Sequence, residues 1–242
     1  MSQYLTDGYY GQSAADAPVN ERVAFIRRTY LHLCGAVLLF AGMTALLLQA
    51  GAGIAMFKMM SSIGTAAWIG MMVVFIGGSI GAQYMARSDS SPAIQYLGLG
   101  LFVGLYTIMF LPILTLCTTI PQFKHIPQQA GLMTLIVFGG LSAVVFVSKR
   151  DFSFLGYALP VLALIALGLI ITSVVFGFSL GIWFSVGMIA LMCGYVLYDT
   201  SNVLHHYDTR SHVAASLALF STLAMLFYYI VRLMMQLSSS ND

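Results

Sequence analysis

The chain has 242 residues, of which 60% are hydrophobic and only 7% are Asp, Glu, Lys or Arg. A soluble domain carries about 25% charged residues because its surface faces water, so this composition excludes a soluble globular class and indicates an integral membrane protein. The formal net charge of +2 is small and the basic residues are scattered, which argues against a nucleic-acid partner. The three cysteines all lie in apolar stretches, so they indicate packing between helices and not a disulfide framework or a metal site.

The first 28 residues are polar. They include six charged residues and lack the apolar core and cleavage site of a signal peptide. We therefore expect a cytoplasmic tail over residues 1–28, a membrane domain over residues 29–237 and a short outer tail over residues 238–242.

Charge-free apolar runs follow, and most are close to the ~20 residues that a membrane-spanning helix needs. The run from Phe152 to Tyr198 is too long for one crossing and contains a Gly-rich turn signal at 176–181, so we expect two helices there. The predicted fold is all-α with seven transmembrane helices, since no segment alternates in polarity as a transmembrane barrel requires. The pairs Gly77/Gly81 and Gly100/Gly104 have the small-xxx-small spacing of close helix contacts. The expected spans are residues 30–49, 65–86, 94–117, 129–148, 154–176, 180–205 and 212–236.

The basic residues indicate the orientation. With the N-terminus in the cytoplasm, seven basic residues lie inside, and only Lys58 and Lys124 lie outside. Arg232 falls within the last helix, where we expect its side chain to extend to the outer interface. Seven crossings then place the C-terminus outside.

One carboxylate lies at membrane depth. Asp199 falls roughly 10 Å before the cytoplasmic end of the sixth helix, by the helical rise, and an ionised side chain there is costly and indicates function. Two interpretations are open: a charge neutralised by Arg87 or Arg210 that holds helix ends together, or a polar path or proton-responsive gate that opens to the cytoplasm. The residues that share the helical face of Asp199 are Tyr195, Asn202 and His206.

Enzyme classes fail on the residues they need. An intramembrane aspartyl protease needs two membrane aspartates, a retinal protein needs a lysine in the last helix, and a zinc hydrolase needs three convergent ligands. The chain has one membrane aspartate and no lysine beyond Lys149, and its clustered histidines lack an i, i+4 pair. We expect no enzyme activity.

Four segments carry a resemblance to a known family. They are Gly194-Tyr-Val-Leu-Tyr-Asp199-Thr-Ser-Asn202-Val-Leu-His205, Ala214-Ala-Ser-Leu-Ala-Leu-Phe220, Leu226-Phe-Tyr-Tyr-Ile-Val-Arg232-Leu and Lys149-Arg-Asp-Phe-Ser-Phe-Leu155-Gly. Over about residues 25–237 the chain resembles the Bax-inhibitor (transmembrane Bax inhibitor motif) family. The Asp-Thr-Ser-Asn-x-x-His run looks most similar to its bacterial YccA-like branch.

The resemblance implies a fold in which the seventh helix is surrounded by the other six, and it implies no enzyme activity. It links the chain to calcium leak, pH-sensitive gating and protection against cell death, and the YccA-like branch to an FtsH-type membrane protease. The family's gating pair consists of aspartates on helices six and seven. Asp199 matches the first aspartate, Thr222 stands at the second, and Met225 stands where an asparagine often follows. Arg87 approximately matches an arginine that pairs with the first aspartate.

The missing acid sets the functional expectation. Calcium takes six to eight oxygen ligands, so Asp199, Thr222 and Asn202 with backbone and water oxygens give only a weak, singly charged calcium site. Our leading hypothesis is a protein that regulates membrane-protein quality control by binding an FtsH-type protease. The alternative is a pH-sensitive calcium-leak channel with Asp199 at the pore. The resemblance suggests a bacterial inner membrane, with a eukaryotic endoplasmic reticulum membrane as the alternative.

Overall fold

The structure, a computed structural model, describes residues 13–87 and 91–240. Within these residues, seven helices are long and apolar enough to cross a membrane, which confirms the predicted all-α class and the number of spans. A short helix α2 and one 3-10 turn η1 complete the described elements. The elements are α1 Val19–Gln49, α2 Ala52–Ile63, α3 Thr65–Ala86, α4 Pro92–Thr119, η1 Pro121–Phe123, α5 Ile126–Ser148, α6 Leu155–Phe176, α7 Ile182–His205 and α8 His212–Ser239.

Two features at the start of the chain differ from the prediction. Helix α1 begins at Val19, so residues 19–28, expected as part of a polar tail, are helical. The reason is a buried face that extends below the apolar run: Phe25 and Thr29 are buried in line with Leu33. Helix α2 was also not expected. It lies between two glycines in the left-handed region, Gly51 at φ 75° and Gly64 at φ 74°, which turn the chain before and after it.

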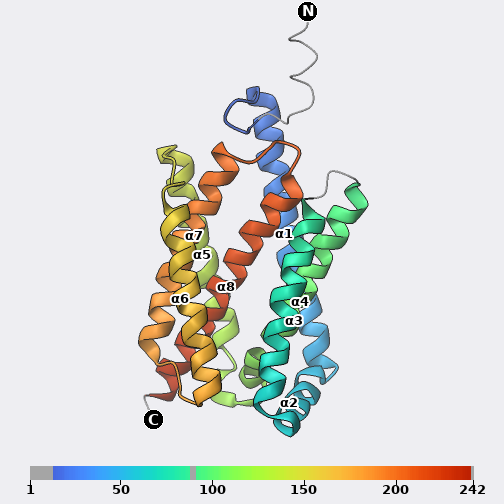
Figure 1. Cartoon of the computed structure of the whole chain (residues 1–242), viewed down its shortest axis with the longest axis vertical. Helices are drawn as coiled ribbons and strands as arrows, with labels where there is room; N and C mark the ends of the chain where they lie inside the picture. Colours follow the sequence, from blue (N-terminus) through green and yellow to red (C-terminus); the bar gives the residue numbers. More distant parts are fainter. Residues whose placement is uncertain (1–12, 88–90, 241–242) are drawn as a thin grey trace, which may run out of the picture.

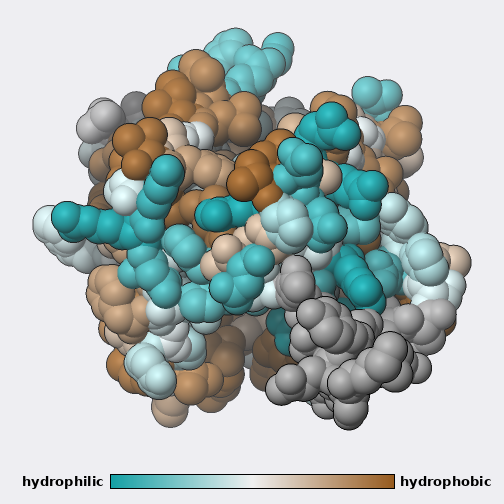
Figure 2. All heavy atoms as spheres, turned by 90° about the horizontal axis from the view of Figure 1, so that it is seen from above, coloured by the Kyte–Doolittle hydropathy of each residue, from teal (hydrophilic) through white to brown (hydrophobic). Residues whose placement is uncertain are grey.

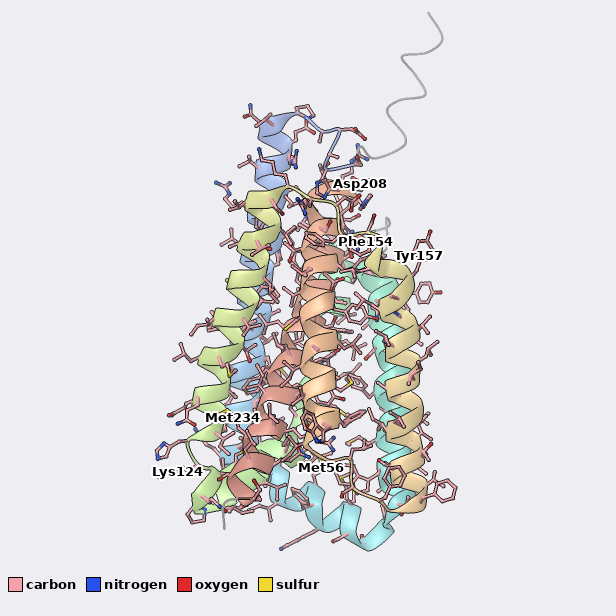
Figure 3. The ribbon with its side chains drawn as sticks, turned by 90° about the vertical axis from the view of Figure 1, so that its left-hand side faces the viewer. Met56, Lys124, Phe154, Tyr157, Asp208 and Met234 are labelled. Atoms are coloured by element: carbon pink, nitrogen blue, oxygen red, sulfur yellow. The ribbon has the colours of Figure 1, made fainter. Side chains whose placement is uncertain are left out.

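The helices run between two ends of the bundle (Figure 1). The N-terminal end carries the start of α1 and the loops 149–154 and 206–211, while the C-terminal end carries α2, η1 and the end of α8. Figure 3 shows Phe154 and Asp208 at the first end and Met56 and Lys124 at the other. The seven basic residues expected inside fall at or near the N-terminal end, and the two expected outside fall at the C-terminal end.

Helix α8 lies at the centre of the bundle, as predicted. In its most apolar window 72% of the residues are buried, against 11% for α3 and for α6. It packs directly against α1, α3, α4, α5 and α7, while α6 joins the ring through α7 and α3. At the core, the Phe220 ring meets those of Phe40, Phe102 and Tyr106 at centroid distances of 6.0, 6.3 and 5.5 Å. The last helix of the chain is therefore the one that the others surround.

Close helix contact is made at glycines next to the predicted ones. A Cβ at Gly98 would lie 2.8 Å from the Ala82 carbonyl oxygen, so α3 and α4 touch backbone to backbone at this point. A Cβ at Gly100 would meet nothing within 4 Å, and the same is true of Gly77 and Gly81. The spacing rule identified the right two helices and the wrong faces, because glycines occur on several faces of each.

Candidate functional site

A cavity of about 430 Å³ opens near the N-terminal end, between α3, α6, α7 and α8. Five of the six residues predicted for a gate or ion path line it: Asp199, Thr222, Asn202, Tyr195 and Arg87. Several further hydroxyl and amide groups face the same space. The other lining residues are Gln83, Ala86, Tyr106, Ala163, Met192, Tyr198, Tyr207, Ala214, Leu217, Ala218, Ser221 and Met225.

Asp199 and Thr222 meet directly across the α7–α8 contact. The Thr222 hydroxyl Oγ1 donates a hydrogen bond to Asp199 Oδ2 at 2.5 Å. Thr222 is buried, at 5% exposure, while the Asp199 side chain reaches the cavity. A hydroxyl therefore stands where the family resemblance places a second carboxylate, and it satisfies one oxygen of the first.

The carboxylate has no direct cationic partner within the structure's described ranges. Arg87 caps the C-terminal end of α3 at the cavity edge and is exposed, but it forms no salt bridge with Asp199 within 4.0 Å. Tyr207 lies near both groups. The pKa of Tyr207 is raised to about 12, mainly by burial, with a smaller contribution from Asp199 in the same direction and an opposing one from Arg87. The predicted pairing of Arg87 with Asp199 is therefore at most a longer-range attraction within a shared cavity.

His206, the sixth predicted residue, does not line this cavity. Helix α7 ends at His205, so His206 leaves the face it would have shared with Asp199. Its Nε2 lies 3.1 Å from Asp151 Oδ2, and the two side chains form an ion pair when the histidine is protonated. The histidine thus belongs to a second site at the same end of the bundle.

That second site fixes the 149–154 loop to the end of α7. The Ser201 hydroxyl donates to Asp151 Oδ1 at 3.2 Å and accepts from the Phe152 N–H at 2.9 Å. Asp151 Oδ1 also accepts from the Ser153 N–H at 2.8 Å, an Asx turn. The Ser153 N–H and, to a lesser degree, His206 hold the pKa of Asp151 below its usual value. Asp151 was not among the predicted site residues, although it lies in the 149–156 segment that carried the resemblance.

The N-terminal segment lies against the second loop at this end. Ala14 N–H donates to the Tyr207 carbonyl at 2.8 Å, and Ser13 pairs with Asp208 as an antiparallel bridge. Ala14 is fully buried by this contact. Because Tyr207 also lines the cavity, residues 13–17 are connected to its edge. Figure 2, which views this end, shows hydrophilic residues gathered over its middle.

The donor set fits a weak cation site and not a tight calcium site. Calcium takes six to eight oxygens, with carboxylates supplying the charge. Among the described residues that line the cavity, Asp199 is the one carboxylate, and its Oδ2 already accepts from Thr222. In the part of the chain that the structure describes, no three His, Cys, Asp or Glu residues converge as metal ligands.

A ring of helices surrounds a central one, and a cavity lined by the Asp199 carboxylate lies at one end. This arrangement defines a multi-pass membrane protein with an intramembrane polar site. The family model described as "Inhibitor of apoptosis-promoting Bax1" matches residues 22–239. The chain therefore belongs to the Bax inhibitor family, as its motifs suggested.

Relatives of this chain occur in viruses, animals and bacteria. It is 28% identical to the Golgi anti-apoptotic protein of Vaccinia virus (strain Lister) over 236 residues, covering 94% of this chain and 92% of the relative. It is 27% identical to Protein lifeguard 4 of Mus musculus over 230 residues, covering 93% and 90%. It is 28% identical to an uncharacterized protein of Pseudomonas aeruginosa over 166 residues, covering 67% and 73%. No solved structure matches the chain.

Proposed function

We propose that the protein is a non-enzymatic membrane protein that acts through a partner at its N-terminal end, and that it does not conduct calcium efficiently. The partner class we infer is an FtsH-type membrane protease, which would make the protein a regulator of membrane-protein quality control. The observation that carries the proposal is the Thr222–Asp199 hydrogen bond. It shows a hydroxyl beside Asp199 at the position where calcium gating by an acid pair needs a second acid.

A separate observation supports a partner at this end. The loops that leave the bundle here are short, and the Ser13–Ala17 segment is held on the 206–211 loop by one backbone hydrogen bond and one bridge. A partner that pulls on the preceding residues would strip this segment from Tyr207 and from the cavity edge. Binding at the N-terminus is thereby coupled to the environment of Asp199.

The proposal is tested by shortening the N-terminus in cells. Deleting residues 2–12 leaves Ser13–Ala17 and all of α1 in place, so insertion should be unaffected. The half-life should lengthen in cells that contain the protease and stay unchanged in cells that lack it. Replacing residues 2–12 by a Gly/Ser sequence of equal length is the matched control, because a protease that engages the tail by its length would still bind this variant. An unchanged half-life of the deletion variant in the presence of the protease would contradict the proposal.

A pH-sensitive calcium leak is the second candidate, and one observation favours it. A second cavity lies beyond the first along α8, and Met225 is the residue that lines both. The two cavities together extend toward opposite ends of the bundle, so Met225 stands where a path between them would close. The second cavity is lined mainly by apolar side chains, which oppose the passage of a hydrated ion.

Flux into liposomes between pH 6 and pH 8 separates the two candidates. We expect little calcium flux through the native protein and little change with Asp199→Asn. Thr222→Asp should restore an acid pair and give pH-dependent calcium binding, since one member of a close pair resists ionisation. Robust pH-gated flux in the native protein that Asp199→Asn abolishes would establish the channel and overturn the first proposal.

A further inference from the structure

The second cavity is amphipathic along its length. It has a volume of about 820 Å³ and lies between α3, α4, α6 and α8 in the C-terminal half of the bundle. Its walls toward the middle of the bundle are methionine, aromatic and aliphatic side chains. Its polar groups gather where α8 approaches the C-terminal end: Arg232, Gln236, Ser239 and Ser240.

Arg232 is a cation that pairs with no carboxylate among the residues the structure describes. Its Nη2 donates to the Leu180 carbonyl at 3.0 Å, and its guanidinium lies 5.7 Å from the centre of the Phe184 ring. Within residues 13–87 and 91–240, no carboxylate lies within 4.0 Å of it. A guanidinium has five N–H donors in a planar fork, so most of its capacity is left for a bound anion. A charge at this depth is costly unless it is paired.

Gln236, the other long polar side chain, is already engaged. Its Oε1 accepts from the Ser185 hydroxyl at 2.7 Å, and its Nε2 donates to the Leu180 carbonyl at 3.0 Å. These bonds fix the Leu180 carbonyl against α8, and Arg232 is held on the same carbonyl. The arginine is therefore positioned by the protein, and no described carboxylate pairs with its charge.

The wall that α3 contributes to the cavity is partly exposed. Trp68 and Ile76 both line it and are 37% and 41% exposed. On another wall, α6 packs mainly against α7. We take this partly exposed wall of α3 as the side from which a molecule dissolved in the membrane would enter the cavity.

We propose that this cavity binds an anionic phospholipid of the bilayer, with one acyl chain in the apolar part and the phosphate on Arg232. The volume lies within the roughly 300–1,000 Å³ typical of small-molecule sites. Arginine suits the anion because two parallel N–H groups match two phosphate oxygens. Along α8, Arg232 lies about 10 Å from Met225, which lines the end of the cavity toward the middle of the bundle, by the helical rise. The apolar stretch between the two residues is the place for the acyl chain.

Tryptophan fluorescence tests the proposal, because the protein has two tryptophans and one of them lines the cavity. Trp183→Phe leaves Trp68 as the single reporter. The full-length variant in neutral detergent is titrated with phosphatidylglycerol or phosphatidylcholine that carries brominated chains, since bromine quenches tryptophan on contact. Phosphatidylglycerol should reach half-maximal quenching at about tenfold lower concentration, the equivalent of one charge-assisted contact.

Three variants decide the outcome. Arg232→Gln should abolish the preference for phosphatidylglycerol, while Lys124→Gln, at the same end but outside the cavity, should keep it. Ser173→Phe, which fills the cavity from α6 and leaves Arg232 intact, should reduce quenching by both lipids. It also serves if Arg232→Gln fails to fold. Equal quenching by the two lipids, an unchanged preference in Arg232→Gln, or undiminished quenching in Ser173→Phe would each overturn the proposal.

Discussion

Replacing Thr222 by Val removes the hydroxyl that donates to Asp199 and keeps the side-chain shape. The lost bond is short, at 2.5 Å, and Thr222 is 5% exposed, so water has little access to replace it from that side. A hydrogen bond to a charged group contributes about 1.5–3 kcal/mol. For a chain of this size, a loss of about 2 kcal/mol lowers Tm by about 4–8 °C.

The assay is thermal unfolding of the purified protein in detergent, measured for the two single variants and the double variant. In the Asp199→Asn background the acceptor is neutral, so Thr222→Val should cost about half as much, which gives a coupling energy of about 1 kcal/mol. Thr134→Val is the matched control, because its buried hydroxyl bonds only to the Ala130 carbonyl of its own helix. Equal losses from Thr222→Val in both backgrounds would show that the hydroxyl does not stabilise the carboxylate and would refute the reasoning.

Three other predictions concern the rest of the bundle. A reporter fused after Arg150 should lie in the cytoplasm and one fused after the last residue outside it, because seven basic residues fall near the N-terminal end; both reporters on one side would contradict the topology. Gly98→Ala should lower Tm in detergent sharply, since its Cβ would lie 2.8 Å from the Ala82 carbonyl oxygen. Gly100→Ala meets nothing within 4 Å and should leave Tm unchanged. Equal effects of the two substitutions would show that α3 and α4 are not in backbone contact at Gly98. The pKa of Asp151 is lowered in the folded protein, so this carboxylate stabilises the fold at pH values above its unfolded pKa of 3.8. The contribution is lost as pH falls through the folded pKa, so Asp151→Asn should flatten the decline in Tm at acid pH. An unchanged decline would exclude the 149–154 loop as the source of the acid sensitivity.

The number of helices and the central carboxylate could be predicted because both depend on local chemistry. A charge-free run of sufficient length has no alternative to a helix in lipid, and Asp199 stands out as the one acid within such a run. Its partner Thr222 followed from the family resemblance, and the hydrogen bond between them is consistent with that placement.

The features that the sequence did not predict depend on three-dimensional contacts. The hydrogen bond from Ser201 to Asp151 joins residues that lie 50 positions apart in the sequence, and neither residue is unusual in its own segment. The early start of α1 depends on burial of Phe25 against other helices, which a polar local sequence conceals. The second cavity is a void between four helices, and a void has no residue pattern of its own.

The central position of α8 determines the order in which this protein can be completed. Helices generally enter the membrane in the order of synthesis, from the N-terminus onward, and α8 is the last of the seven spans. Until it arrives, α1, α3, α4, α5 and α7 lack the surface against which each of them packs. A chain truncated before His212 would retain six spans and lack the helix at their centre. The core of the bundle therefore closes only when α8 has been inserted, and a copy without α8 differs from one with it across the whole bundle.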